Sequence, residues 1–414
     1  MAVPIDFSFS LLSYSFPVAI VIATFIPWFV YSVTLQSDIE ALRSLKQEID
    51  PYTIPPSSFL ETWDFHADPC ENPEEQFLGI VCTIPVDNST ARVVEIDLDA
   101  AGYNGFLTPA IGNLTELTIL NLAKNRFWGP IPSSLSNLRN LTKLQLSNNL
   151  LTGFFPQIID MLKRLEIIDV SHNELSGSIP RNIANHRTLT VLILANNQFT
   201  SRIPDLMGLW QLNTLDLSRN ELNGNLPRLP ARLKTLLLSN NNLSGHISPL
   251  KRFTNLETMD LSHNNFSGPI YHEILALPSV NHINLSINSF TEMEVIKISN
   301  TDSQLEVLDV HSNNISGHLS RNLATYPNLA TIDLGDNQFS GRIPVEYGQM
   351  VDGTWRSVFL DNNWLVGRLP PQFNNSRVSI MGSLAQNCLD CPDNIQLCNG
   401  GQKPASQCVG PNTW

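Results

Sequence analysis

The chain has 414 residues, of which 42% are hydrophobic and only 15% are charged, and 38 acidic against 25 basic residues give a formal net charge of −13. Nucleic-acid binding requires a basic surface, so this balance argues against that class of function. Anionic pectin would also be repelled on average, although local patches can differ from the total.

The first predicted element is a secretion signal over residues 1–34. Residues 16–33 carry no charged side chain and end shortly before the polar residues Gln36, Ser37 and Asp38, so cleavage is expected near Ser32. The run approaches the length of a membrane span and no lysine or arginine precedes it, so a retained signal anchor is the alternative. In either case the rest of the chain is expected to face an oxidising compartment.

A helix is predicted at the start of the N-terminal segment, residues 35–92. Ser37 and Glu40 have the spacing of a capping box, and Pro51 is expected to stop the helix. One helical face carries the apolar residues Ile39, Leu42, Leu45 and Ile49.

Residues 93–387 repeat one motif. Leu165–Pro180 read LEIIDVSHNELSGSIP, a copy of the pattern LxxLxLxxNxLxGxIP, and its asparagine returns every 21 to 26 residues. A further copy, with Ile96 and Leu98 in register, lacks the asparagine and brings the number of copies to twelve. This period is diagnostic of a leucine-rich-repeat solenoid. The asparagines of this ladder are Asn125, Asn149, Asn173, Asn197, Asn220, Asn241, Asn264, Asn288, Asn313, Asn337 and Asn363.

The motif predicts an α/β solenoid, a right-handed curved superhelix with a parallel sheet on its concave face. Alternation in each LxL core, such as Leu144 and Leu146, puts the leucines on one face of a short strand, and stacked copies bury them against their neighbours. The asparagine that follows can donate and accept hydrogen bonds, so we expect the ladder to satisfy backbone groups of successive turns. We interpret these asparagines as structural residues.

Two further patterns carry a family resemblance. The turn GxIP or GxLP occurs at Gly129–Pro132, Gly177–Pro180, Gly341–Pro344 and Gly367–Pro370, and the N-terminal segment contains FLETWDFHADPC and FLGIVC, which end at Cys70 and Cys82. Together they resemble the plant extracellular leucine-rich repeats of receptor-kinase ectodomains, receptor-like proteins and polygalacturonase inhibitors. The resemblance covers about residues 38 to 408 and implies a cap with a Cys70–Cys82 disulfide, in which Phe77 replaces a tryptophan. A cap is physically required, because the end of a solenoid exposes an apolar cross-section.

The Cys-rich tail, residues 388–414, contains Cys388, Cys391, Cys398 and Cys408. Four cysteines allow three pairings, and the CxxC spacing also fits zinc or redox chemistry. A secreted context favours a disulfide-linked C-terminal cap. No membrane span, kinase domain or lipid-anchor signal follows, so a complete chain of this kind is expected to signal only through a partner.

Eight sequons support secretion, and glycans could solubilise a chain with so few charges. They begin at Asn88, Asn113, Asn140, Asn242, Asn265, Asn284, Asn314 and Asn374. Asn284 is expected to point out of the concave sheet, where a sugar would block that part of the surface.

Two copies break the rhythm. The spacing from Asn220 to Asn241 falls to 21 residues, and after Asn288 the position of the glycine is taken by Glu292. Tolerated loop variation is favoured over a binding site at both places.

A binding surface is expected on the outward positions of the strands. Aspartate is the commonest residue in the central outward column, and three members are apolar instead: Ile193, Leu237 and Phe359. Ile167 and Val191 in the next column would form an apolar cluster with Ile193, and exposed apolar clusters often mark partner sites. Scattered surface hydrophobes are the alternative reading.

No catalytic constellation, cofactor motif or metal motif stands out. His172 and His263 both precede a ladder asparagine, lie almost four copies apart and share no carboxylate at ligand spacing. We therefore expect a binding protein and no enzyme.

The function that these patterns favour is recognition of a peptide, glycan or protein outside the cell. We expect a receptor-like protein of plant signalling or defence, at the cell wall or the outer face of the plasma membrane, that works with a membrane receptor kinase. The alternative is a secreted inhibitor of the polygalacturonase-inhibitor type. That family has about ten repeats, four cysteines in the N-terminal cap and a basic concave area, whereas this chain has twelve copies, two cysteines there and acidic columns.

Overall fold

The computed structural model describes residues 34–408 except 72, 84–88, 299–302, 375–379 and 393. The predicted secretion signal, the sequon at Asn88 and residues 409–414 lie outside the described residues. Residues Ser32–Trp414 form one compact unit. Among the described residues, no helix combines the length and the apolar character that crossing a bilayer requires.

The N-terminal segment contains α1 (Gln36–Gln47), the 3-10 helices η1 (Pro51–Thr53) and η2 (Phe59–Thr62), α2 (Pro73–Gln76) and β1 (Ile80–Thr83). A disulfide joins Cys70 to Cys82. Phe77 is fully buried, with its ring centroid 6.2 Å from that of Trp63 and 5.4 Å from that of Phe65. These contacts build a small apolar centre that closes the N-terminal end of the repeats.

The predicted capping box is wrong. The helix begins at Gln36, so Ser37 lies inside the first turn, and the N-cap Leu35 has no capping side chain. Helix α1 ends at Gln47, four residues before Pro51. The helix is held instead by Asp38, a fully buried carboxylate that accepts two hydrogen bonds from Arg92, at 3.0 and 3.1 Å, and one from the Val93 amide at 3.0 Å.

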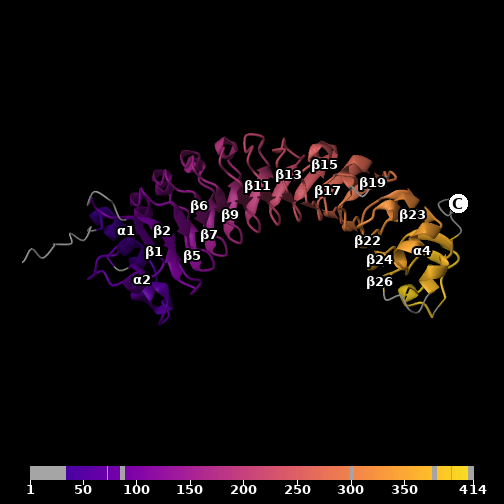
Figure 1. Ribbon diagram of the computed structural model, residues 1–414, viewed down its shortest axis with the longest axis horizontal. Helices are drawn as coiled ribbons and strands as arrows, with labels where there is room; N and C mark the ends of the chain where they lie inside the picture. The colour runs from indigo at the N-terminus through magenta and orange to yellow at the C-terminus, as the bar shows by residue number, and fades with distance from the viewer. Residues whose placement is uncertain are drawn as a thin grey trace, which may run out of the picture. The chain divides into compact units, whose positions relative to one another are not determined.

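The principal sheet has 14 strands, with β1 antiparallel to β2 and all later strands parallel. It lines the inner side of the arc of repeats (Figure 1), which confirms the predicted parallel sheet on the concave face. One strand, β26, lies beyond the twelve predicted copies. The strands after β1 are β2 (Arg92–Asp97), β4 (Ile119–Asn121), β6 (Lys143–Gln145), β8 (Ile167–Asp169), β10 (Val191–Ile193), β12 (Thr214–Asp216), β14 (Thr235–Leu237), β16 (Thr258–Asp260), β18 (His282–Asn284), β20 (Val307–Asp309), β22 (Thr331–Asp333), β24 (Ser357–Phe359) and β26 (Met381–Ser383).

A second layer of strands follows the ladder asparagines and forms two smaller sheets, of nine and four strands. The division falls after β19, the strand of the irregular copy that carries Glu292. The first sheet comprises β3 (Asn104–Phe106), β5 (Arg126–Pro130), β7 (Leu150–Phe154), β9 (Glu174–Ser178), β11 (Gln198–Arg202), β13 (Glu221–Gly224), β15 (Asn242–Gly245), β17 (Asn265–Ile270) and β19 (Ser289–Met293). The second comprises β21 (Ser316–His318), β23 (Gln338–Gly341), β25 (Trp364–Arg368) and β27 (Cys388–Asp390).

Short helices cover the outer side of most copies. They are the 3-10 helices η3 (Pro109–Asn113), η4 (Ser133–Asn137), η5 (Gln157–Met161), η6 (Arg181–Asn185), η7 (Ser248–Arg252), η8 (Arg321–Thr325) and η9 (Pro371–Asn374), together with α3 (His272–Leu275) and α4 (Val345–Val351). A last 3-10 helix, η10 (Gln396–Cys398), lies in the tail.

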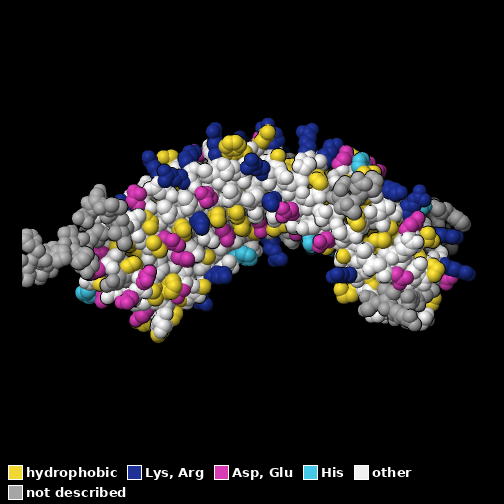
Figure 2. Space-filling view, in the orientation of Figure 1, with side chains coloured by type: hydrophobic (Ala, Val, Ile, Leu, Met, Phe, Trp, Pro, Cys, Tyr) yellow, Lys and Arg dark blue, Asp and Glu magenta, His cyan; other side chains and the backbone are white. Residues whose placement is uncertain are grey.

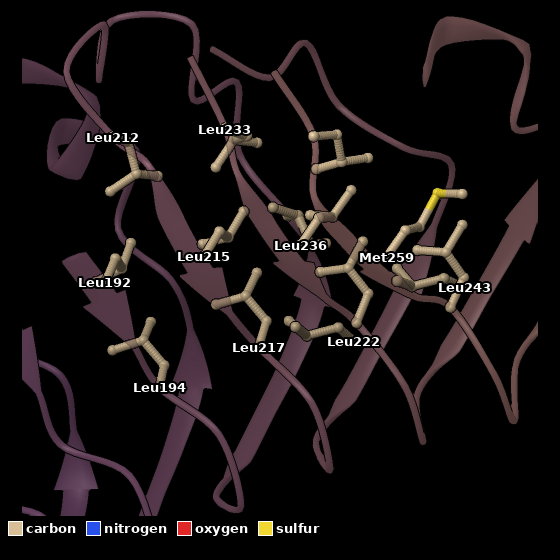
Figure 3. Close-up of a cluster of buried hydrophobic side chains, with 14 of the residues drawn as sticks. Leu192, Leu194, Leu212, Leu215, Leu217, Leu222, Leu233, Leu236, Leu243 and Met259 are labelled. Atoms are coloured by element: carbon tan, nitrogen blue, oxygen red, sulfur yellow. The ribbon is translucent and has the colours of Figure 1, made fainter. Parts of the chain in front are cut away.

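The core is a continuous row of leucines between the strands and the outer segments. Leu192, Leu215, Leu236 and Met259 come from four consecutive strands and are fully buried side by side (Figure 3). Each side chain is covered by the equivalent residue of the next copy, so an isolated copy would expose its leucines to solvent.

The ladder asparagines connect each copy to the one before it. Asn173 donates through Nδ2 to the carbonyl oxygens of Val170 and Ser171 in its own copy, both at 3.1 Å, and to that of Leu146 in the preceding copy at 3.0 Å. Its Oδ1 accepts from the Leu151 amide of the preceding copy at 2.9 Å. Buried backbone groups that would otherwise lack partners are thereby satisfied.

The ladder extends one residue beyond the predicted set. Asn387, fully buried, donates to the Leu360 oxygen at 2.9 Å and accepts from the Leu365 amide at 3.1 Å. In the tail Gln402 takes the same part for the last copy: it donates to the Leu384 oxygen and accepts from the Leu389 amide, both at 3.1 Å. A glutamine side chain from the cap therefore ends the ladder.

Disulfides fix the tail against the last copies. Cys388 pairs with Cys408 and Cys391 with Cys398, which selects one of the three possible pairings. Lys403 lies between them and the ladder, with Nζ 2.5 Å from the Asn363 oxygen and 4.0 Å from the centroid of the Trp364 ring. These contacts give the solenoid a disulfide-linked cap at its C-terminal end as well.

Candidate recognition surface

The exposed face of the principal sheet consists of two columns, formed by the first and third residues of each strand. In the three-residue strands from β4 to β24 the middle residue is buried, whereas the two flanking residues are half-exposed in most of these strands. Strand residues alternate between the two faces of a sheet, so this pattern is the expected one. The two columns are the surface that the sheet presents to a ligand.

The aspartates of the third-residue column close the turns that follow their strands. Asp169 Oδ1 accepts from the Ser171 amide at 3.0 Å and from the Ser171 hydroxyl at 2.6 Å, and Asp216 makes the same pair of bonds with Ser218 at 2.9 and 2.6 Å. A carboxylate at this position therefore has a structural role in addition to its charge. In a copy without this carboxylate, the amide two residues later loses that hydrogen-bond acceptor.

The structure brings three of the five predicted binding residues together. Val191 lies directly opposite Ile167 on the neighbouring strand, and Ile193 lies at the other end of the Val191 strand. All three are half-buried. Ile193 is flanked by Asp169 and Asp216, whereas Thr214 lies opposite Val191 and Lys143 lies opposite Ile167, so the cluster is acidic at its Ile193 end only.

The other two predicted residues lie apart from this cluster. Leu237 on β14 is two strands from Ile193, between Asp216 and Asp260. Phe359 on β24 lies near the C-terminal end of the sheet, opposite Asp333 on one side and Ser383 on the other. Both are half-buried. A ligand of the Ile167–Val191–Ile193 cluster could reach Leu237 along the sheet, whereas Phe359 belongs to a different part of the surface.

A titratable cluster, Asp309, His311 and Asp333, lies beside Phe359. His311 Nδ1 is 2.7 Å from Asp309 Oδ1 and 3.9 Å from Asp333 Oδ2, and one ligand atom from each residue fits within 4.8 Å of the others. Burial, together with the neighbouring Asp309 carboxylate, raises the pKa of Asp333 to about 6. These residue types could hold a divalent cation, and so could His272, Glu273 and Glu294, which are grouped in the same way. No motif in the sequence indicates either group, and the one available signal is that Asp309 and Asp333 are one repeat apart in the same column.

The two histidines considered as catalytic candidates are turn residues. His172 and His263 have positive φ angles of 53° and 52°, as do the residues before the other ladder asparagines, and both side chains are exposed. His172 Nδ1 lies 2.5 Å from the Asn196 side chain. Their positions follow from the geometry of the repeat.

The sequons differ in accessibility. Asn113, Asn242, Asn265 and Asn314 are exposed. Asn140 is half-buried, and its side chain bonds Glu116 at 2.9 Å and Arg164 at 2.8 Å. Asn284 is half-buried on the concave face, and its Oδ1 accepts from the Ser286 amide and hydroxyl. The side chain of Asn374 lies outside the described residues.

Comparisons with known families match two parts of the chain. Residues 35–83 match the leucine rich repeat N-terminal domain. Leucine rich repeat models match residues 115–175 and the four segments 188–210, 211–233, 232–252 and 255–277. The first range contains α1 and the Cys70–Cys82 disulfide, and the others lie within the solenoid.

A protein of Arabidopsis thaliana named "Probably inactive leucine-rich repeat receptor-like protein kinase" is 32% identical over 104 residues, which cover 24% of this chain and 15% of that protein. Among solved structures, the plant peptide hormone receptor RGFR1 in complex with RGF2 has a TM-score of 0.57 at 24% identity and covers 72% of this chain and 56% of its own. A plant ice-binding protein has a TM-score of 0.55 at 24% identity and covers 88% of this chain and 98% of its own. At this level of identity the structural matches establish the fold alone.

The chain spans a small part of the curated relatives it matches, and the fold that it shares with them is typical of binding proteins. The capped solenoid, the paired cysteines and the matched segments agree with one another. The chain is a leucine-rich-repeat protein with a plant-type N-terminal cap, similar to the ectodomains of plant receptor kinases.

Proposed function

We propose that this protein recognises a peptide, glycan or protein ligand outside the cell and works with a membrane receptor kinase in plant signalling or defence. The observation that carries the proposal is the apolar cluster of Ile167, Val191 and Ile193 on the concave sheet. Ile193 replaces an aspartate that would serve the turn, so the exchange is not needed for the fold. An apolar patch of this kind, with charged residues beside Ile167 and Ile193, suits a partner that buries its own apolar side chains there.

The chemistry of the surround indicates which ligands fit. Asp169 and Asp216 lie on either side of Ile193, so a ligand with a basic group next to an apolar group would be complementary to the cluster. The similarity to a peptide hormone receptor in complex with its ligand supports a peptide. The disulfides at both ends support passage through the secretory pathway, and we place the protein at the cell wall or the outer face of the plasma membrane. We propose binding and no catalytic role.

The test introduces negative charge into the apolar cluster. The double variant Val191→Glu/Ile193→Asp should abolish capture of a receptor kinase from plant cell surfaces under native conditions while the protein remains folded. Both positions are half-exposed on short strands, so the strands can accept the new side chains. Thr258→Glu on β16, in the same column as Val191, is the matched control and should leave capture unchanged. Equal capture by the double variant and the unmodified protein would refute the site.

The alternative is inhibition of a cell-wall-degrading enzyme. Purified protein added to a fungal polygalacturonase should leave its rate unchanged if the receptor-like function is correct. A dose-dependent loss of polygalacturonase activity would favour the inhibitor instead.

A further inference from the structure

A basic segment interrupts the acidic chain at the shortened copy. Residues 225–253 contain five Lys or Arg residues and no Asp or Glu, in a chain that has 38 acidic residues. Even the concave aspartate is absent here, because Leu237 occupies its position. Figure 2 shows Lys and Arg side chains gathered along the outer edge of the repeats above β11, β13 and β15, with hydrophobic side chains between them.

The same copy leaves a groove on the outer side. The segments between β11 and β12 and between β13 and β14 contain no 3-10 helix, whereas η6 and η7 flank them. The 21-residue spacing leaves too few residues to build the outer ridge at this place. The result is a groove of about 780 Å³ whose lining includes Met207, Leu226, Arg228, Lys251, Arg252 and Tyr271.

The cations of this groove are accessible. Arg228, Lys251 and Arg252 are all exposed. Arg228 contacts Asp205 at the groove edge, and Lys251 Nζ lies 3.6 Å from Glu273 Oε1 and 5.8 Å from the centroid of the Tyr271 ring. Such exposed pairs are weak and easily exchanged for a ligand carboxylate. Arg252 has no ion-pair partner among the described residues.

Aromatic and apolar side chains complete the surface. Met207 in the groove lining is 58% exposed, Trp210 three residues further along the chain is 59% exposed, and Tyr271 is half-buried in the groove wall. The negative face of an aromatic ring attracts the weakly positive C–H groups of a sugar ring. A narrow groove that offers both cations and aromatic faces is suited to a chain of charged sugars.

We infer that this groove binds an anionic polysaccharide whose charges are carboxylates, a polyuronate. A peptide that added to the sheet would need a free strand edge, but β11, β13 and β15 are each paired on both sides. Lys251 and Arg252 lie on η7 itself and are exposed, so a lipid surface is the competing occupant that the vesicle arm of the experiment tests. The groove lies on the side opposite the concave cluster, so both ligands could be held at once and the two proposals can fail separately.

The experiment measures binding of the full secreted chain to an oligogalacturonate, with neutral dextran as the comparison and a chelator present to exclude calcium bridging. The variant Arg228→Gln/Lys251→Gln/Arg252→Gln should bind about tenfold more weakly, and its affinity should depend less steeply on salt because fewer counterions are released. Trp210→Ala should also weaken binding without a change in salt dependence. The control Arg139→Gln/Arg321→Gln/Arg342→Gln removes the same charge from exposed positions elsewhere and should bind as the unmodified protein does.

Unchanged thermal unfolding of the variants would show that lost binding is not lost folding. Three results would each overturn the proposal. They are equal binding to dextran, equal binding by the groove and control variants, and retention on anionic vesicles without binding to oligogalacturonate.

Discussion

Replacing His186 with leucine should stabilise the protein, and by more at acid pH than at neutral pH. His186 follows η6, its side chain is fully buried, and neither ring nitrogen has a hydrogen-bond partner among the described residues. The equivalent positions after η4 and η5 are the buried residues Leu138 and Leu162. The site is therefore built for a leucine and holds an imidazole of similar size.

The gain at neutral pH comes from removing two buried polar atoms without partners. An unsatisfied buried group costs about 1–3 kcal/mol, so we expect His186→Leu to raise the free energy of unfolding by about that amount. Leucine also contributes apolar surface to a position that is already dry.

The gain at acid pH comes from proton linkage. Burial, with the nearby Lys163, lowers the pKa of His186 below its ordinary value of 6.5. The unfolded chain therefore binds a proton at a higher pH than the folded chain does. The free energy of unfolding is therefore at its full value above pH 6.5, where His186 is neutral in both states. It falls as the pH drops through the folded-state pKa of His186, by at most about 1.4 kcal/mol per pH unit.

The assay is denaturant unfolding of the unmodified protein and the variant at about pH 7.5 and about pH 5.5, with hydrogen exchange at the neighbouring amides as a local readout. Leu162→His is the matched control, because it places a buried imidazole at the equivalent position of the preceding copy. It should destabilise the protein with the same acid dependence. An unchanged or lower stability of His186→Leu at both pH values would refute the reasoning, since it would mean that the imidazole is satisfied in the folded protein.

Two further predictions concern the C-terminal half. Asp333→Asn should stabilise the protein by about 1–2 kcal/mol at pH 7.5 and change its stability little at pH 4. The raised pKa of Asp333, about 6, favours the folded state below the unfolded pKa of 3.8, and this advantage is lost as the pH rises through 6. Denaturant unfolding at the two pH values measures the effect, and a variant that is less stable at pH 7.5 would contradict the prediction. Gln402→Ala should leave the global unfolding transition nearly unchanged but speed hydrogen exchange at the Leu389 amide by more than tenfold, because that amide loses its acceptor. A Leu389 amide that stays protected in the variant would show that Gln402 does not end the ladder.

The parallel sheet and the ladder could be predicted because they depend on local repetition. Each ladder asparagine sits at a fixed distance from its LxL core, and the same rule would have found Asn387, which is 24 residues after Asn363 and is followed by Leu389. The same stretch also fits the start of the Cys-rich tail, because Cys388 follows Asn387 directly. The capping box failed for a different reason: the buried Asp38 bonds Arg92 at a distance in sequence that no local pattern reports.

The candidate surface could be predicted only in part. The strand period placed Ile167 opposite Val191, because their separation equals one repeat. The disulfide pairing in the tail, the exposure of Arg252 and the groove beside it depend on how irregular segments fold, and residue spacing does not fix those conformations. A shortened copy signalled that something differs at residues 221–241, but not that the difference is a gap in the outer ridge.

The ladder has a direction, because the side-chain carboxamide that completes each turn belongs to the following copy. Whatever follows the last copy must therefore bring its own carboxamide, and Gln402 does so from 15 residues beyond Asn387. Another array of 24-residue units could adopt residues 388–408 as a cap only if its last copies also offered the groups that Lys403 contacts here, the Asn363 oxygen and the Trp364 ring. Protein engineers who graft this segment onto such an array would have to keep the spacing from its final asparagine to Gln402, or the new array would fray from that end.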